Sequence, residues 1–234
     1  KVEALKYKTD GEYDVVTRID EEVEQFLKEE LAKVYPDIAF VGEETGGDRT
    51  AKKYWIVDPV DGTLLYIRGL PFCTTMLALV ENGEVIFSVI YDFVAGVVYH
   101  AEKGKGAYKD GVRIHVSKRA PSKSFICYET HLDKQKNLDI FIKLREFLVL
   151  FKVVCSGYEF AMIAEGKVEG KVCFDPWGKD YDYAPGSLLV TEAGGVITNL
   201  HKTTYSVSDY DFIAATPELH EKLTKGSDAI FPIH

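Results

Sequence analysis

The sequence predicts an α+β first half built on an antiparallel sheet, followed by an α/β second half. Three observations lead to this prediction. Two apolar-rich strand segments, 74–81 and 84–93, are separated by Asn82-Gly83, a typical two-residue hairpin turn. A glycine-rich meander continues this sheet toward residue 113. Beyond it, helical and strand patterns alternate, as they do in α/β proteins.

The first half is predicted to begin with a helix and to continue as strands. A helix is expected over residues 20–35, because apolar side chains recur there at helical spacing, Thr17 or Asp20 can cap its start and Pro36 ends it. The strands expected in this half are 38–41, 54–57, 74–81, 84–93 and 96–101, and the stretch 104–113, which contains Asp110-Gly111, is expected to continue the antiparallel meander.

The second half is predicted to alternate strands with helices. Its expected strands are 124–128, 150–155, 171–174, 195–198 and 211–214. Its expected helices are 135–147, 158–165, 184–192 and 217–225. A polar stretch at 117–122 gives the boundary between two predicted units, 1–120 and 121–234.

Composition narrows the function classes. The net charge of −9 argues against a nucleic acid or an anionic membrane as a partner, and we find no apolar run long enough to span a membrane. The four cysteines form no C-x-x-C pair, so free thiols in a reducing, cytoplasmic compartment are expected. Six scattered histidines give no zinc-site spacing.

The most informative segment is Asp58-Pro59-Val60-Asp61-Gly62-Thr63. A predicted apolar strand delivers Asp58 at its end, and a turn can bring Asp58, Asp61 and the Val60 carbonyl toward one point. Oxygen ligands of this kind suit a hard cation such as Mg²⁺. A short helix or turn starting at Gly62 would present free N–H groups to a phosphate.

Other acids stand at comparable places. Glu43 follows a predicted strand, Asp20 lies at a predicted helix start, and Asp182 stands just ahead of the helix predicted at 184–192. Each has a structural explanation of its own, as part of a turn, a solvated loop or a helix cap. Their occurrence together, in this order, favours a metal-dependent active site.

These segments resemble the signature of the inositol monophosphatase family, which includes archaeal-type fructose-1,6-bisphosphatases and lithium-sensitive nucleotide phosphatases. The matching segments are 14–17 with Asp20 (D-x-V-T-x-x-D), 42–44 (G-E-E), 58–63 (D-P-x-D-G-T), 104–107 (G-x-G-A), 182–186 (D-x-A-x-G) and 192–195 (E-A-G-G). The likeness runs from about residue 8 to the C-terminus, and Lys8 is a loose match to a family lysine near a third metal.

The resemblance implies a layered α-β-α-β-α sandwich and a Mg²⁺-dependent phosphomonoesterase. Its substrate would be a small polyol or sugar phosphate, inositol 1-phosphate or fructose 1,6-bisphosphate or both. Hydrolysis would proceed by direct attack of a metal-activated water, with two to three Mg²⁺ ions. A homodimer and sensitivity to lithium are also implied.

Residue roles follow from the same resemblance. The implied ligands are Glu43, Asp58 and the Val60 carbonyl for one Mg²⁺, and Asp58, Asp61 and Asp182 for a second. Glu43, Asp20 and Thr63 are the implied catalytic residues, with Asp20 and Thr63 orienting the attacking water. The implied substrate contacts are Gly62, Thr63, Asp175 and Asp182.

Two departures from the family pattern leave alternatives open. Tyr181 stands where the family has a tryptophan, and Asp180 is a rival to Asp182 as metal ligand. The alternative functions are a nucleotide 3′-phosphatase, a non-catalytic cation-binding homologue and a purely structural α/β domain. No basic, aromatic-lined base pocket is evident for the first, and the complete carboxylate set argues against the second. A purely structural domain explains the strands but not the co-occurring motifs.

Overall fold

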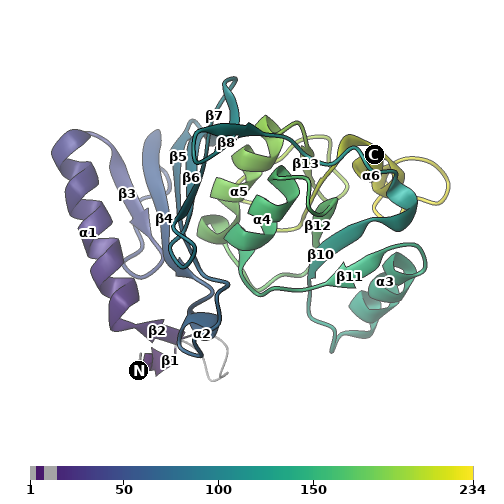
Figure 1. The fold of residues 1–234 in the computed structure, drawn as a ribbon, viewed down its shortest axis with the longest axis horizontal. Helices are drawn as coiled ribbons and strands as arrows, with labels where there is room; N and C mark the ends of the chain where they lie inside the picture. The colour runs from purple at the N-terminus through teal and green to yellow at the C-terminus, as the bar shows by residue number, and fades with distance from the viewer. Residues whose placement is uncertain (1–3, 8–14, 234) are drawn as a thin grey trace.

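Helices and sheets alternate in layers in the computed structural model (Figure 1), which describes residues 4–7 and 15–233. One helix covers the outer face of the first sheet, two lie between the sheets, and two cover the outer face of the second sheet. In that order they are α1 (Arg18–Val34), α4 (Ser156–Ala164) with α5 (Asp180–Glu192), and α3 (Gln135–Arg145) with α6 (Pro217–Thr224). The α-β-α-β-α sandwich implied by the resemblance is thereby confirmed.

The first sheet has seven strands in the order β3-β4-β5-β6-β7-β8-β9. They are β3 (Ala39–Gly42), β4 (Lys53–Asp61), β5 (Thr74–Glu81), β6 (Glu84–Asp92), β7 (Val97–Glu102), β8 (Gly106–Lys109) and β9 (Val112–Ile114). β3 and β4 are parallel, and every later pair is antiparallel. The antiparallel meander expected from the hairpin and glycine signals is therefore confirmed.

The second sheet is mixed, in the order β11-β10-β12-β14-β13. Its strands are β10 (Phe125–Glu129), β11 (Val149–Phe151), β12 (Gly170–Cys173), β13 (Val196–Asn199) and β14 (Phe212–Ala215). β11 and β12 both run parallel to β10, so the loops that follow these three strands emerge at one edge. β14 is antiparallel to β12 and β13.

Four short elements complete the described part of the chain. β1 (Ala4–Tyr7) and β2 (Val15–Thr17) form an antiparallel pair that the sequence did not predict, and α2 (Thr63–Tyr66) is a single turn. A 3₁₀ turn, η1 (Pro121–Lys123), precedes β10. Two residues of the family resemblance, Lys8 and Asp14, lie outside the described residues.

Several predicted boundaries differ from the structure, among them the strand expected over 150–155, which is Val149–Phe151, and two of the differences lie at the candidate site. β4 does not end before Asp58 but continues through Asp61, because its backbone goes on pairing with β5. α5 begins at Asp180 rather than at residue 184, so Pro185 lies inside the helix and not in its first turn. The helix starts early because the Asp182 side chain accepts the Lys179 N–H and thereby caps it.

Small residues allow α4 and α5 to pack closely between the sheets. A Cβ added at Gly186 of α5 would lie 2.0 Å from the ring of Phe160 on α4. A Cβ added at Gly157 of α4 would lie 2.3 Å from the Thr74 hydroxyl of β5. The main apolar core is built around these two helices and includes residues of both sheets. No helix in the described part of the chain is long and apolar enough to cross a membrane.

Candidate active site

A β-bulge in β4 places two aspartates on the same face of the first sheet. Asp58 pairs with Met76 of β5 and Asp61 pairs with Thr74, so the step of three residues in β4 matches a step of two in β5. Successive side chains of a strand point to opposite faces, and the extra residue therefore turns Asp61 to the side that Asp58 occupies. Proline is tolerated at such a bulge, which explains Pro59 within the strand.

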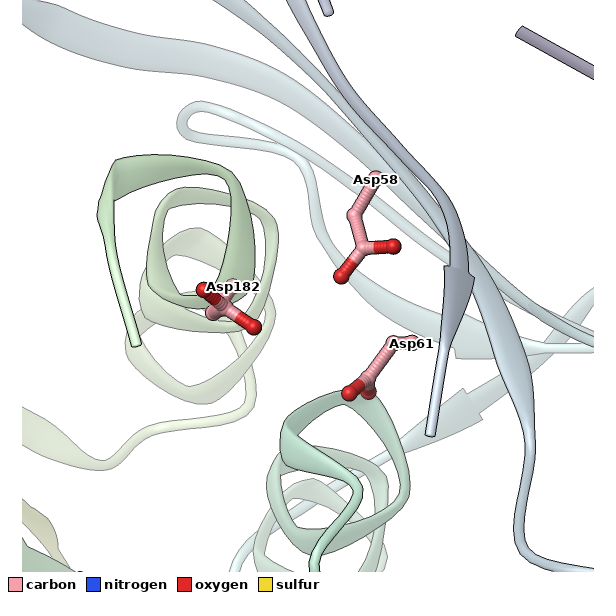
Figure 2. Close-up of side chains that lie close together, drawn as sticks. All are labelled: Asp58, Asp61 and Asp182. Carbon is pink, nitrogen blue, oxygen red and sulfur yellow. The ribbon is translucent and has the colours of Figure 1, made fainter. Parts of the chain in front are cut away.

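Asp182 of α5 completes a cluster of three carboxylates (Figure 2). One carboxylate oxygen from each of Asp58, Asp61 and Asp182 lies within 4.8 Å of the other two. Asp182 is the third residue of α5, and its Oδ2 accepts the Lys179 N–H at 2.7 Å. The first sheet and the middle helical layer thus contribute to one centre.

Glu43 is a fourth carboxylate at this centre. It directly follows β3, and the parallel pairing of β3 with β4 brings it alongside Asp58. Its N–H donates to the Val57 carbonyl at 3.0 Å, and its carboxylate lies near enough to that of Asp58 to raise the pKa of Asp58 further than burial alone does. The structure therefore brings together four of the acids that the sequence singled out.

Asp61 is held by the N-terminus of α4, from the second half of the chain. Its Oδ1 accepts the Ser156 N–H at 3.1 Å. Its Oδ2 accepts the Gly157 N–H at 2.6 Å, the Cys155 thiol at 3.1 Å and the Thr74 hydroxyl at 3.2 Å. Three donors surround Oδ2 and only one reaches Oδ1, so Oδ1 is the oxygen with room for a further ligand. The helix N-terminus also favours a negative charge here.

The protonation of the three aspartates reflects their burial and mutual repulsion. Burial raises the pKa of Asp58 well above its ordinary value, and the charges of Glu43 and Asp61 raise it further. Burial raises the pKa of Asp182 as well, and the charges of Glu43 and Asp61 again raise it further. Burial raises the pKa of Asp61 to about 6, although the N–H of Gly157 acts in the opposite direction. A bound cation would relieve this repulsion.

Asp20 and Thr63 form a hydrogen-bonded pair next to Val60. Asp20 is fully buried, and its Oδ2 accepts both the N–H and the hydroxyl of Thr17, the N-cap of α1. The Thr63 hydroxyl lies 3.0 Å from Asp20 Oδ1 and 2.7 Å from the Val60 carbonyl oxygen. Thr63 has one hydroxyl proton for these two acceptors, and its oxygen can itself accept a hydrogen bond from a third group.

Gly62 shapes the turn that follows the bulge. Its φ of +86° lies in the left-handed region, and it is the N-cap residue of α2. A Cβ added there would lie 2.7 Å from the Phe72 carbonyl oxygen and 3.4 Å from Cys155 Cβ. Glycine is therefore required both for conformation and for space.

Two residues considered in the sequence analysis, Asp175 and Asp180, do not belong to the three-aspartate cluster. Asp175 follows β12 with a φ of +54°, and its carboxylate accepts hydrogen bonds from Lys134 and Asn137 rather than joining the three aspartates. Asp180, the rival to Asp182, accepts two hydrogen bonds from Arg49, at 2.5 and 3.0 Å. Its carboxylate is thus engaged by a guanidinium, while Asp182 faces Asp58 and Asp61.

Sequence reasoning missed two supporting residues, Glu24 and Arg49. Glu24 lies four residues after Asp20, on the same side of α1, and both are buried. That helical spacing was visible in the sequence and could have indicated Glu24. The partner of Arg49 is 131 residues away along the chain, so no local pattern could indicate it.

The residues present fit a hard divalent cation. Among the described residues, Asp58 Oδ1 is buried without any hydrogen-bond partner, which is unusual for a carboxylate oxygen and is what a metal ligand requires. The groups around it that could ligate a metal are carboxylates and a backbone carbonyl, the oxygen ligands that Mg²⁺ prefers.

Comparison with known proteins agrees with this site. The chain matches the model of the inositol monophosphatase family over residues 2–230. It is 31% identical to the fructose-1,6-bisphosphatase/inositol-1-monophosphatase of Thermotoga maritima over 230 residues, which are 96% of this chain and 86% of that protein. Two solved structures are also similar. The Thermotoga maritima IMPase has a TM-score of 0.83 at 28% identity, covering 95% of this chain and 85% of that chain. The extragenic suppressor protein suhB of Bartonella henselae has a TM-score of 0.84 at 26% identity, covering 94% and 86%.

The layered fold and the carboxylate centre are those of metal-dependent phosphatases as a class. Because the family model matches nearly the whole chain, the chain belongs to the inositol monophosphatase family, whose members act on phosphorylated sugars or polyols.

Proposed function

We propose that this protein is a Mg²⁺-dependent phosphomonoesterase for a small polyol or sugar phosphate, with inositol 1-phosphate and fructose 1,6-bisphosphate as the two candidate substrates. The observation that carries the proposal is the convergence of Asp58, Asp61 and Asp182 within 4.8 Å, together with the unpartnered Asp58 Oδ1. Family membership supports the phosphatase class. The Thermotoga maritima relative, named for both activities, supports keeping both substrates.

Four acids and one carbonyl would hold the cations. Glu43, Asp58 and the Val60 carbonyl would hold one Mg²⁺, and Asp58 would share a second with Asp61 and Asp182. A third, weaker ion near Asp20 would bring the number to three. When bound, Mg²⁺ cancels the charge of the phosphate dianion, stabilises the leaving oxygen and makes water a better nucleophile.

Thr63 and Asp20 would take up the proton of the attacking water. The Thr63 hydroxyl donates to Asp20 Oδ1 at 3.0 Å, so its oxygen can accept a proton while its own passes to Asp20. The two hydrogen bonds from Thr17 hold the Asp20 carboxylate in a fixed orientation for this transfer. Attack would be direct and in line, without a phosphoenzyme.

The substrate would lie between the turn at Gly62 and the loop after β12. The N–H groups of Gly62 and Thr63 would bind the phosphate, since the start of α2 leaves such groups free of helical partners. Asp175 and the 51% exposed Trp177 lie in the loop that leads into the first turn of α5, which carries Asp182. A carboxylate and an aromatic ring suit the hydroxyls and the apolar face of a polyol.

Phosphate release from the two substrates, with and without Mg²⁺, tests the proposal. We expect Mg²⁺-dependent release from at least one, and the ratio of the two kcat/KM values identifies the preferred substrate. Asp58→Asn should reduce kcat by more than about 100-fold at saturating Mg²⁺, because even groups that only orient a metal ligand are worth about 10- to 100-fold.

Two outcomes would count against the proposal. Near-normal turnover by Asp58→Asn would refute the ligand assignment. Release from a nucleoside 3′-phosphate alone would favour the nucleotide phosphatase instead. The homodimer, the cytoplasmic location and the inhibition by lithium stay predictions from the resemblance.

A further inference from the structure

Residues 43–49, here called the strap, connect helices on the two faces of the first sheet. The strap begins with Glu43 at the end of β3 and closes a tight turn in which Gly42 and Gly46 exchange backbone hydrogen bonds of 2.9 and 3.1 Å. It then passes close over β3, since a Cβ added at Gly47 would lie 2.2 Å from the Phe40 carbonyl oxygen. α1 and α5 lie on opposite sides of this sheet (Figure 1).

Glu24 anchors the strap to α1. Its Oε2 accepts the Glu44 N–H at 2.8 Å and its Oε1 accepts the Thr45 N–H at 2.9 Å. Glu24 is 1% exposed, and a Cβ added at Gly42 would lie 2.2 Å from its carboxyl carbon. The Glu24 carboxylate is therefore packed tightly against the backbone at Gly42. These two hydrogen bonds hold the residues immediately after Glu43.

Arg49 anchors the other end of the strap to α5. Its Nε and Nη2 donate to the two carboxylate oxygens of Asp180, at 2.5 and 3.0 Å. Asp180 is almost completely buried and is the first residue of α5, two positions before Asp182. A paired, two-point contact of this kind fixes orientation as well as distance.

We propose that the strap, through Glu24 and the Arg49–Asp180 pair, sets the spacing between Glu43 and Asp182 and thereby the affinity of the centre for Mg²⁺. Glu43 lies on the strap itself, whereas Asp182 lies in the first turn of α5, and the hydrogen bond that Glu192 of this helix accepts from β8 is at the opposite end of the helix. The strap contains Glu43 and, through Arg49, contacts the first residue of α5. Glu24, Arg49 and Asp180 are positioning residues, and their role rests on the proposed function.

Arg49→Met separates positioning from simple electrostatics. Removing a cation near a Mg²⁺ site should tighten Mg²⁺ binding by Coulomb's law alone. Loss of the anchor predicts the opposite, a Mg²⁺ Kd raised about 10- to 100-fold, the range seen when the support of a metal ligand is removed. Arg49→Lys keeps the charge but loses the two-point geometry, so it should also bind Mg²⁺ more weakly than the wild type.

Glu24→Gln tests the other anchor against a matched control. Glutamine offers one acceptor oxygen to two N–H donors, so the strap should lose one hydrogen bond and the Mg²⁺ Kd should rise. Glu192, at the C-terminal end of α5, also accepts two backbone N–H groups, those of Gly104 and Gly106, both at 2.7 Å. It lies ten residues from Asp182, about 15 Å along the helix. Glu192→Gln should lower stability by a similar amount and leave the Mg²⁺ Kd unchanged.

Isothermal titration calorimetry with Mg²⁺ on the folded variants gives the decisive readout, with kcat at saturating Mg²⁺ measured alongside. We expect a raised Kd for Glu24→Gln, Arg49→Met and Arg49→Lys, with kcat largely recovered at high Mg²⁺. Arg49 is partly exposed, so both of its variants should fold. If both bind Mg²⁺ with the wild-type Kd, the proposed role of the strap is refuted. If the wild type binds Mg²⁺ but hydrolyses no substrate, the proposed function fails while the comparison of Kd values still decides the strap. A wild type that binds no Mg²⁺ would overturn both.

Discussion

Without a cation, the ionised form is unfavourable for each of the three clustered aspartates, Asp58, Asp61 and Asp182. All three have raised pKa values, and burial is the largest cause in each case. For Asp61 the pKa rises from 3.8 to about 6, a shift that corresponds to about 3 kcal/mol. The centre is therefore built for a ligand that compensates negative charge, and its stability should depend on both protons and metal.

The stabilising effect of Mg²⁺ should increase with pH. Because the pKa of Asp61 is higher in the folded state, its protonation favours folding fully below about pH 4, and this contribution is lost as the pH rises through about 6. Mg²⁺ must displace the same protons, so its gain in Tm should be small near pH 5 and large near about pH 8. Thermal unfolding with and without millimolar Mg²⁺ measures this gain. A gain that is equal at both pH values would contradict the assignment of these carboxylates as ligands.

The bulge of β4 and the turn at Gly62 together position the candidate site, and Gly62→Ala tests the turn. Gly62 and Gly83 have nearly the same φ, +86° and +81°, but a Cβ at Gly83 has no atom within 4 Å. Gly83→Ala should therefore cost only the left-handed strain, about 1 kcal/mol.

Gly62→Ala adds a clash with the Phe72 carbonyl oxygen, 2.7 Å from the new Cβ, and must displace the backbone next to Thr63. Displacements of about 1 Å can cost about 100-fold in rate, so kcat/KM should fall by that order in this variant only. Urea denaturation measures the stability of both variants, and phosphate release measures their activity. Equal activity of the two would show that the turn is not part of the site.

Local patterns predicted most helices and strands but not the contacts between them. Apolar spacing located α1, and Asn82-Gly83 located the β5–β6 hairpin, since both signals lie within a few neighbouring residues. The bulge was not predicted, because it exists only in the pairing of β4 with β5. The start of α5 was predicted at residue 184, whereas its cap lies five residues earlier, at Lys179.

The candidate site was predicted as a set of acids, while their supports were not. Asp58, Asp61 and Gly62 stand in one motif, Glu43 and Asp182 were noted at the ends of predicted elements, and the resemblance to a family supplied their roles. The helix that holds Asp61 begins 95 residues further along the chain, at Ser156. Such pairings depend on how α4 and α5 pack between the sheets, which no short segment encodes.

The protein as a whole is tied together through its middle layer. α4 donates to Asp61 of the first sheet through its first residues, and the Ser156 hydroxyl accepts a hydrogen bond from Lys171 of β12 at 2.9 Å. Lys171 is completely buried and forms ion pairs with Glu159 at 2.8 Å and Glu129 at 3.1 Å. Burial opposes its charge, but these two carboxylates raise its pKa well above the ordinary value. A buried ion cluster thus joins the second sheet to the helix that holds Asp61.

Lys171→Met should lower stability strongly without splitting the unfolding transition. Removing the cation leaves two buried carboxylates unpaired, which costs about 3–5 kcal/mol. The control Lys103→Met removes an exposed ion pair with Glu84 and should cost less than about 1 kcal/mol.

Tryptophan fluorescence can report on the first half of the chain alone. The chain has two tryptophans, Trp55 in β4 of the first sheet and Trp177 in the second half, so Trp177→Phe leaves Trp55 as the single probe.

In that background, Trp55 fluorescence and far-ultraviolet circular dichroism should give coincident urea curves, and Lys171→Met should shift both together. The reason is structural: α4 and α5 pack against strands of both sheets, so neither sheet keeps its apolar face covered once these helices unfold. Separate transitions, with the fluorescence curve left in place while circular dichroism shifts, would show instead that the first sheet is stable without the ion cluster behind α4.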